Sequence, residues 1–275
     1  MNSGNGKGEK MFGAIIGDIV GSRFEYKNIK NKDFVFFHSS SHFTDDTVLT
    51  IAIADALLSI PHPTINENEH SFLFASKLKS WSKRYWKVGY GQRFFRWMLS
   101  EDMSPYSSFG NGAAMRVSPV AWYAKTLDET ERLARISAQV SHNHPEGIKG
   151  AQAIAGMIYL ARSKACISEL KAYAEQYYEL GFTLDEIRPV YCHNESAPKS
   201  IPQAIVAFLE STSFEDAIRN AISIGGDSDT IAAITGSIAE AYYGIPSPIA
   251  IHSKEYLPSD MIQVLEVFQS KYQRS

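Results

Sequence analysis

The stretch GGDSDTIAAITGSIAEAYYG, residues 225–244, gives the clearest single indication of how this 275-residue chain folds. Two glycines free the backbone, aspartates and hydroxyl residues alternate after them, and small and apolar residues then continue to Tyr243. Gly244 and Pro246 follow, which is the usual pattern at the end of a helix. We therefore predict a helix over 229–243 with acidic side chains at its beginning.

Comparable helix signals recur along the chain, so we predict an all-α, compact single domain. Apolar spacings of three and four residues, capping residues and terminating glycines predict helices over 12–21, 44–60, 72–87, 91–100, 127–140, 145–161, 168–180, 214–222 and 259–272. The small residues of FGAIIGDIVG (12–21) should let that helix pack very close to its neighbours. The best strand candidate is FVFFH at 34–38. Irregular stretches over 26–42, 101–112 and 189–200 are expected to carry parts of a site.

The composition excludes several classes of protein. Hydrophobic residues make up 44% of the chain and charged residues 21%, which is typical of a globular domain, and the net charge of −3 gives no general attraction to nucleic acid. No apolar run approaches the about 20 residues of a membrane-spanning helix. Cys166 and Cys192 lie far apart, which favours a reducing cytoplasm. We expect a cytoplasmic monomer, with a flexible tail over 1–11 and one domain over 12–275.

Two acidic motifs stand where predicted helices begin. The first is TDDT, residues 44–47, and the second is DSDT, residues 227–230. Either motif by itself is explained by capping and by the favourable interaction of carboxylates with a helix dipole. If the two helix ends pack together, however, four carboxylates meet, and their repulsion would raise their pKa values strongly. Two divalent cations would remove that conflict, and oxygen ligands suit Mg²⁺ or Mn²⁺. Glu25 is a candidate fifth carboxylate.

Two further segments have the residue types of an anion-binding site. FGNGAAMR, residues 109–116, exposes backbone N–H groups that can cradle a phosphate, and Arg116 adds a positive charge, although such a turn can also simply precede a helix. SHNHPEG, residues 141–147, places two histidines in a turn before a helix, with a spacing that is poor for zinc. We consider a neutral His142 that donates a hydrogen bond to a phosphate or ribose, with a capping histidine as the alternative.

The order of these motifs carries a family resemblance. GDIVGSRFE (17–25), FTDDT (43–47), GNGAAMR (110–116), SHNHPEGIKGAQA (141–153) and the opening stretch follow one another as in the ADP-ribosylglycohydrolase family. That family includes dinitrogenase reductase-activating glycohydrolase and the mammalian ADP-ribosylhydrolases. The resemblance covers about residues 12–244.

The resemblance implies a helical bundle of the ADP-ribosylglycohydrolase type with a binuclear metal cleft that holds two divalent cations, Mg²⁺ or Mn²⁺. The metal ligands it implies are Thr44, Asp45, Asp46, Asp227, Asp229 and Thr230. The residues it implies for the ADP-ribose diphosphate are Gly110, Asn111, Gly112, Arg116 and His142. The carboxylates that it leaves as candidates for catalysis are Glu25, Asp46 and Asp229. Asp18 matches a family aspartate, for which we expect a structural hydrogen-bonding role.

The function that the resemblance implies is hydrolysis of the glycosidic bond between ADP-ribose and an acceptor, with release of ADP-ribose. The loops over 26–42 and 189–200 depart from the family pattern, so the acceptor stays open among arginine, serine, another protein side chain, an ADP-ribosylated nucleic acid and a small molecule. Two alternatives also stay open. One is a non-catalytic ADP-ribose-binding protein, and the other is a two-metal phosphoesterase that acts on a nucleotide diphosphate.

Overall fold

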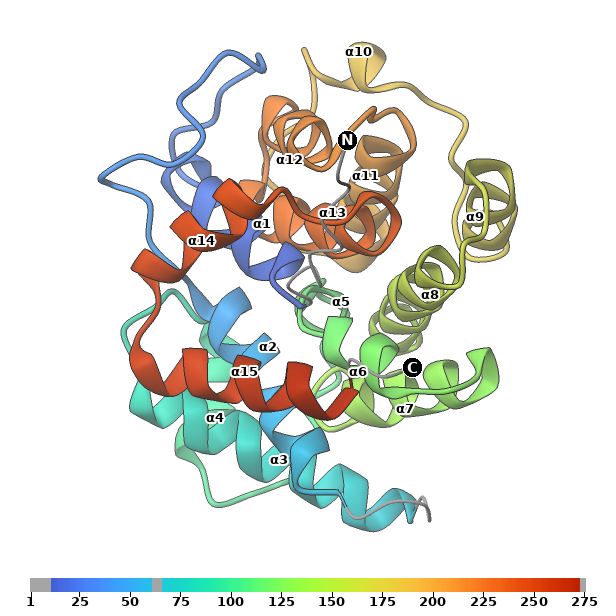
Figure 1. Cartoon of the computed structure of the whole chain (residues 1–275). Coiled ribbons are helices and arrows are strands. Elements are labelled where there is room, and N and C mark those ends of the chain that lie inside the picture. The colour runs from blue at the N-terminus through green and yellow to red at the C-terminus, as the bar shows by residue number, and fades with distance from the viewer. Residues whose placement is uncertain (1–10, 61–65, 273–275) are drawn as a thin grey trace, which may run out of the picture.

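Helix α13 (Ser228–Tyr243) lies at the centre of the molecule, and α1 (Gly13–Gly21) packs along it (Figure 1). The helix predicted over 229–243 is therefore confirmed. All nine residues of α1 are buried, and so is most of α13. A methyl group on Gly17 would lie 2.1 Å from the carbonyl oxygen of Ala232, so the two backbones are in direct contact. The close packing predicted from the small residues of α1 is thus confirmed.

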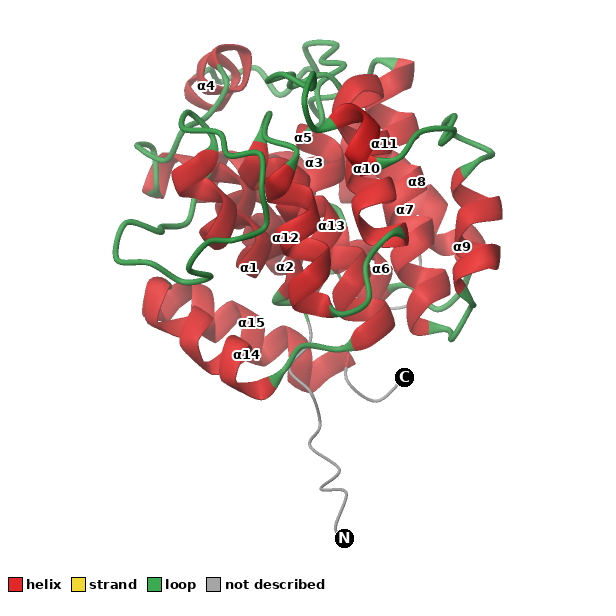
Figure 2. Ribbon diagram, turned by 90° about the horizontal axis from the view of Figure 1, so that it is seen from above, coloured by secondary structure: helices red, strands yellow, loops and turns green. Residues whose placement is uncertain are grey.

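The computed structural model describes residues 11–60 and 66–272, and in these ranges helices joined by loops account for the whole fold, without a β-strand (Figure 2). The remaining elements are η1 (Ser22–Phe24), α2 (Asp45–Leu58), α3 (Glu67–Arg84), α4 (Gln92–Leu99), α5 (Gly112–Met115), α6 (Ser118–Tyr123), α7 (Leu127–Gln139), α8 (Pro145–Arg162), α9 (Ile167–Ala174), α10 (Leu184–Ile187), α11 (Ala197–Leu209), α12 (Phe214–Ser223), α14 (Ser247–Ser253), η2 (Lys254–Tyr256) and α15 (Ser259–Tyr272). None of the described helices combines the length and hydrophobicity that crossing a membrane requires. The predicted tail over 1–11 lies outside the described residues except for Met11, which is buried.

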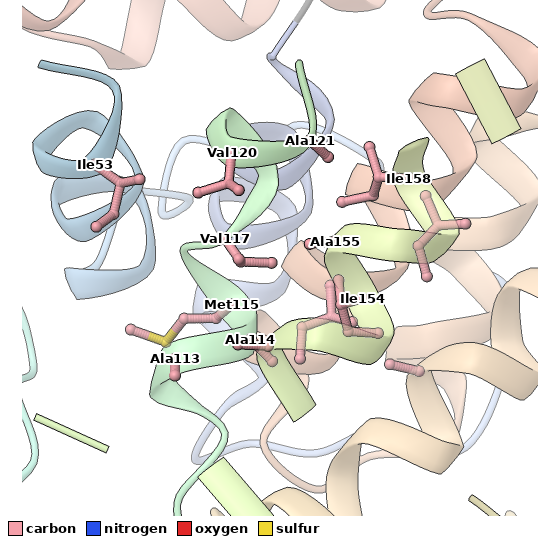
Figure 3. Close-up of a cluster of buried hydrophobic side chains, with 14 of the residues drawn as sticks. Ile53, Ala113, Ala114, Met115, Val117, Val120, Ala121, Ile154, Ala155 and Ile158 are labelled. Atoms are coloured by element: carbon pink, nitrogen blue, oxygen red, sulfur yellow. The ribbon is translucent and has the colours of Figure 1, made fainter. Parts of the chain in front are cut away.

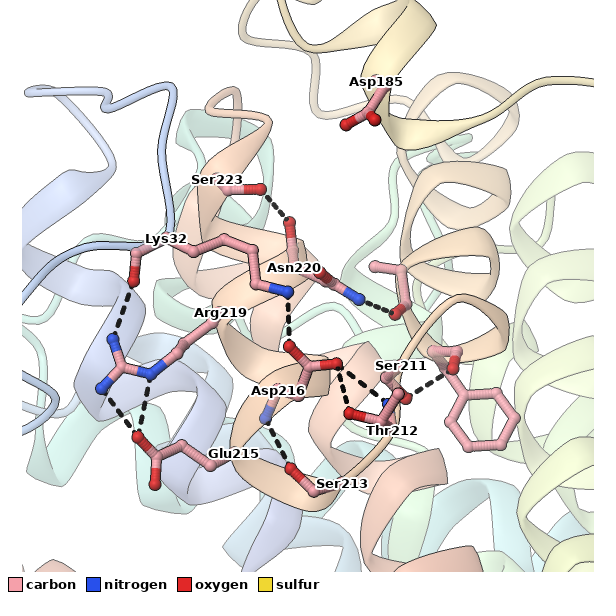
Figure 4. A network of polar contacts seen from close by, with 12 residues as sticks. Lys32, Asp185, Ser211, Thr212, Ser213, Glu215, Asp216, Arg219, Asn220 and Ser223 are labelled. Carbon is pink, nitrogen blue, oxygen red and sulfur yellow. Dashed lines mark hydrogen bonds and ion pairs between the residues drawn. The ribbon is translucent and has the colours of Figure 1, made fainter.

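The strand predicted over 34–38 is wrong, because this segment belongs to an irregular loop with no neighbouring strand. Arg219 of α12 instead donates to carbonyl oxygens of this loop, as Figure 4 shows for Lys32. Arg219 donates from Nη1 to the carbonyl oxygens of Lys32, at 2.9 Å, and Phe34, at 2.8 Å. The Arg219 guanidinium also lies 4.8 Å from the centre of the Phe34 ring. The alternating aromatic residues therefore pack against a helix rather than pairing in a sheet.

Some helices had no clear signal in the sequence. Helices α5 and α6 span only four and six residues, which is too short for a periodic apolar pattern. Helix α11 begins inside the stretch predicted as irregular and has prolines at positions 198 and 202. Pro198 sits in the first turn, where a helix tolerates it, but Pro202 lies in the interior, where proline normally argues against a helix.

A hydrophobic core supports the turns that precede α5 and α8 (Figure 3). Ile53 of α2, Met115 of α5, Val120 of α6 and Ile154 of α8 are all buried there. Each of these helices contributes a side chain to the same apolar cluster. The core therefore fixes, relative to one another, the glycine-rich turn and the histidine-containing turn that the sequence singles out.

Candidate active site

One cavity of about 570 Å³ collects nearly all of the predicted site residues. Among the residues that line it are Glu25, Asp45, Asp46, Gly110, Asn111, Gly112, Arg116, His142, Asp227, Asp229 and Thr230. They come from the turn after α1, the beginnings of α2, α5 and α13, and the segment before α8. The structure thus brings together five segments that are far apart in the sequence.

Thr44 is the one predicted site residue that does not line this cavity. Its hydroxyl donates to Oδ1 of Asp18 at 2.7 Å and accepts a hydrogen bond from the backbone N–H of Asp46 at 3.4 Å. The fully buried Asp18 carboxylate also accepts from the backbone N–H groups of Thr44, at 2.9 Å, and Thr47, at 3.1 Å. Thr44 therefore caps α2, and Asp18 of α1 has the structural hydrogen-bonding role expected for it.

Carboxylates from α1, from the residue after η1 and from the beginnings of α2 and α13 converge in two groups. In one group Asp18, Asp46 and Asp229 each offer an oxygen within 4.8 Å of the others, and in the second Glu25, Asp227 and Asp229 do the same. Asp229 belongs to both groups. Asp227 occupies the N-cap position of α13 without a side-chain capping bond, so capping does not account for this second acidic motif. The geometry is that of two adjacent oxygen-rich sites with a shared carboxylate.

The electrostatics of these groups call for cations. Burial raises the pKa of Asp46 well above its ordinary value, and the neighbouring Asp18 and Asp45 raise it further. The pKa of Asp229 is likewise raised well above its usual range, first by burial and then by Asp227 and Asp46. Oδ1 of Asp46 is buried and has no hydrogen-bond partner among the described residues, while Oδ2 accepts from Thr230 at 3.2 Å. A buried acceptor without a partner, within a set of oxygen ligands, fits a divalent cation.

The glycine-rich turn is attached directly to the acidic cluster. Asn111 donates from Nδ2 to Oδ2 of Asp227 at 2.7 Å. The backbone N–H of Asn111 donates to the carbonyl of Glu195 at 2.9 Å, and Gly110 pairs with Ser196 in an isolated β-bridge. The residues that the sequence suggests for a phosphate therefore lie beside the residues that it suggests for metal ions.

His142 reaches the same turn from the segment before α8. A Cβ atom added to Gly112 would lie 3.0 Å from Nε2 of His142, so the glycine leaves room for the imidazole. On the other side of the ring, Nδ1 lies 2.8 Å from the hydroxyl of Ser141. Burial, and then the positive charges of Arg116 and Arg93, lower the pKa of His142 well below its ordinary value. His142 is consequently a neutral imidazole.

Arg116 lies behind His142 and is fully buried. Nη2 of Arg116 donates to the Ser141 hydroxyl at 2.8 Å and to the Ser137 carbonyl at 3.3 Å. Among the described residues, no carboxylate forms an ion pair with it, and burial lowers its pKa to about 10. The guanidinium therefore supports His142 through Ser141 and adds a positive charge beneath this end of the cavity.

The second histidine of the motif has a different place. His144 is exposed, occupies the N-cap of α8, and accepts a hydrogen bond at Nδ1 from the backbone N–H of Glu146 at 3.2 Å. The capping interpretation that stood as the alternative for this motif thus describes His144, whereas His142 lines the cavity.

Several lining residues are not evident from the sequence alone. They include Tyr26, Tyr90, Arg93, Tyr106 and Glu195. Tyr26, Tyr106 and Glu195 fall within the three irregular stretches that we expected to carry parts of a site. The segment with Tyr90 and Arg93 shows a weaker signal, a tyrosine between two glycines, one of which has a φ of 102°.

Comparisons with known proteins agree on a single family. The family model described as ADP-ribosylglycohydrolase matches residues 9–272. Human ADP-ribosylhydrolase ARH3 is 25% identical over 85% of this chain and 84% of its own length. ADP-ribosylarginine hydrolase Tri1 of Pseudomonas putida is 23% identical over 86% of this chain and 70% of its own length. A solved structure titled ADP-ribosylglycohydrolase-related protein complex covers 97% of this chain and 98% of its own, with a TM-score of 0.65 at 22% identity, which shows the likeness of the fold.

Proposed function

The chain belongs to the ADP-ribosylglycohydrolase family, and from this premise we propose that it hydrolyses the glycosidic bond between ADP-ribose and an acceptor and releases ADP-ribose. The observation that carries the proposal is one cavity lined by carboxylates from two groups that share Asp229 and, beside them, by a glycine-rich turn with a neutral His142. ADP-ribose has a ribose and a diphosphate, and the two ends of the cavity match these parts.

The proposed cofactor is a pair of Mg²⁺ or Mn²⁺ ions. The cavity-lining residues that would hold them are Asp45, Asp46, Asp227, Asp229 and Thr230. Thr44 does not line the cavity and stabilises the beginning of α2 as its N-cap. When bound, the ions supply positive charge that fixes the ribose hydroxyls and increases the acidity of a water beside the anomeric carbon. The desolvated carboxylates described above support this assignment, because a cation offsets their mutual repulsion.

Residues of the chain itself would stabilise the transition state, transfer a proton and bind the diphosphate. Carboxylates close to the ribose stabilise the positive charge of an oxocarbenium-like transition state. Asp46, Asp229 and Glu25 each belong to a cation group. Asp46 and Asp229 are buried, whereas Glu25 is half-buried and its carboxylate bonds with the Tyr26 hydroxyl, so we assign proton transfer to Glu25. At the other end of the cavity, Nε2 of His142 donates to a diphosphate oxygen, together with the backbone N–H of Gly112.

Product analysis tests the proposal. Peptides ADP-ribosylated on arginine or on serine are incubated with the protein and Mg²⁺ or Mn²⁺, and the products are separated by chromatography. We expect free ADP-ribose with at least one acceptor and no release in EDTA. Release of AMP would instead establish a phosphoesterase, and tight binding without any product would establish an ADP-ribose-binding protein. Either of these results overturns the proposal.

The cellular setting and assembly state are part of the same proposal. Both cysteines, Cys166 and Cys192, are free and exposed, which supports a reducing cytoplasm. We expect a monomer that uses an ADP-ribosylated acceptor and no membrane. Size-exclusion chromatography with light scattering gives the assembly state, and a mass near 30.6 kDa is the expected result.

A further inference from the structure

A second cavity, of about 390 Å³, lies next to the active-site cavity. It is lined by Ser22, Arg23, Phe24, Tyr26, Lys27 and Ser40. Tyr26 lines both cavities, and its neighbour Glu25 lines the active-site cavity. A substrate held at the carboxylate cluster can therefore extend past Tyr26 into this second space.

The two cavities have opposite charge. The active-site cavity is lined by six carboxylates, whereas the second has two cations, Arg23 and Lys27, and no acidic side chain. Within the part of the chain that the structure describes, neither cation forms an ion pair with a carboxylate. Two adjacent positive charges without a protein counter-charge suit an anionic ligand.

Two of the residues that line the second cavity, Arg23 and Ser22, are held in place by contacts within the chain. Arg23 donates from Nη2 to the carbonyl oxygen of Val35, and its guanidinium lies 4.3 Å from the centre of the Phe24 ring. The Ser22 hydroxyl accepts from the backbone N–H of His42 at 3.1 Å. A cation that is already immobilised loses little conformational entropy when it binds an anion.

We propose that the second cavity is an acceptor subsite, which binds a carboxylate close to the ADP-ribosylated side chain of a peptide. This inference rests on the proposed function, because it places ADP-ribose in the first cavity. Gly110, Gly112 and His142, which are assigned to the diphosphate, line only the first cavity. An anion in the second cavity consequently comes from the acceptor and not from ADP-ribose.

An acidic peptide fits this cavity better than a nucleic acid. Duplex DNA carries about one negative charge per 1.7 Å, so proteins that bind it provide a row of cations along its length. Here the cations are only two, they share the cavity with the Phe24 and Tyr26 rings, and the whole chain has a net charge of −3. Tyr26, which lines both cavities, is 82% exposed and can contact a peptide side chain.

Two peptides that differ only in charge test the subsite. Both are ADP-ribosylated on the same residue, and one has glutamate on either side where the other has glutamine. For the wild-type enzyme we expect a kcat/KM about tenfold higher with the glutamate peptide. Lys27→Glu and Arg23→Gln should each remove most of that preference while leaving the glutamine peptide within about twofold. Lys125→Glu is the matched control, since Lys125 is exposed and lines neither cavity.

Binding of the same peptides, measured by calorimetry, separates this inference from the proposed function. If neither peptide is cleaved but wild-type binding is tighter for the glutamate peptide and Lys27→Glu abolishes the difference, hydrolysis is refuted and the subsite stands. Equal binding and equal kcat/KM for the two peptides would overturn the subsite. A charge-dependent preference for an ADP-ribosylated oligonucleotide over the glutamate peptide, lost in Lys27→Glu, would also overturn it.

Discussion

Asp229 belongs to both carboxylate groups, so its substitution should weaken cation binding at both proposed sites. We expect Asp229→Asn to lower turnover by about a hundredfold or more, because metal catalysis supplies several kcal/mol of barrier lowering. The fold should persist, since the amide is isosteric and removes a buried charge. Steady-state rates and circular dichroism check this.

Asp128→Asn is a suitable control for that substitution, because Asp128 lies in the exposed first turn of α7. It should leave turnover unchanged. If Asp229→Asn instead retained near-normal turnover and cation binding, the acidic motif of α13 would have only a structural role.

Ser141 connects Arg116 to His142, so we expect it to act as a positioning residue. His142→Ala should weaken ADP-ribose binding by about tenfold to a hundredfold, the value of one hydrogen bond to a charged group. Ser141→Ala should cost about tenfold, because the imidazole loses its fixed orientation. The double variant should be little worse than His142→Ala, and titration calorimetry measures all three. Additive losses would show that Ser141 acts independently of His142.

The neutral state of His142 predicts a pH dependence of stability. Its pKa in the folded protein lies well below the unfolded value of 6.5, so the unfolded chain binds more protons between these two values. Stability attributable to this group is complete above pH 6.5 and falls by up to about 1.4 kcal/mol per pH unit as the pH drops towards the folded pKa. Urea denaturation at pH 7.5, 6.5 and 5.5 measures this effect. The free energy of unfolding should decline less with falling pH in His142→Gln than in the wild type. His144→Asn, which keeps a capping group, should retain the wild-type decline.

At the scale of elements, the contact of α1 with α13 determines the position of the cluster, because Asp18 lies on one helix and Asp229 on the other. Gly17→Ala would place a methyl group 2.1 Å from a carbonyl oxygen of α13 and force the helices apart. We expect a loss of stability of about 1–3 kcal/mol or more, together with weaker cation binding. Thermal unfolding with and without Mg²⁺ measures both effects.

Gly181→Ala is the control for this contact, because a Cβ atom there has nothing within 4 Å. We expect it to leave stability within about 0.5 kcal/mol of the wild type. If Gly17→Ala behaved in the same way, the close packing of α1 on α13 would not be what holds the two carboxylate groups together.

The helices that could be predicted from the sequence are those with local signals. The beginning of α2 at Thr44 and that of α12 at Ser213 follow from capping side chains, and both are present. What could not be predicted depends on contacts that are distant in the sequence. The segment over 34–38 has the alternation of a strand, but Arg219 binds the carbonyl oxygen of Phe34 and Arg23 binds that of Val35, and no local pattern indicates these contacts.

In the candidate site, too, some features could be predicted from local sequence signals, whereas others depend on contacts that are distant in the sequence. Carboxylates at helix beginnings could be predicted to meet because two similar motifs needed a common explanation, and the carboxylates of Asp46 and Asp229 do lie close together. By contrast, the contact of Arg116 with Ser141 depends on the packing of α5 against α8. The turn of the Thr44 hydroxyl towards Asp18 likewise depends on the neighbouring α1.

For the whole molecule, cations should act as a clamp between distant parts of the chain. Thr230 already bonds Asp46 across 184 residues, and bound ions would add stronger links at the same place. At a Mg²⁺ concentration of 100 times its Kd, mass action stabilises the folded state by about 2.7 kcal/mol. For a protein of this size that corresponds to a rise in Tm of roughly 5–10 °C. Differential scanning fluorimetry should show this rise in the wild type, its reversal by EDTA, and no rise in Asp229→Asn.

The distance in sequence between α1 and α13 also has a consequence for biosynthesis. Ribosomes add about 5–20 residues per second, so α13 leaves the ribosome roughly 10–40 s after α1. All nine residues of α1 are buried in the folded protein, but α13, on which α1 packs, has not yet been synthesised during that interval. The nascent chain thus carries an uncovered apolar helix for most of its synthesis, so the contact that builds the site also makes the growing chain prone to aggregation until α13 has been made.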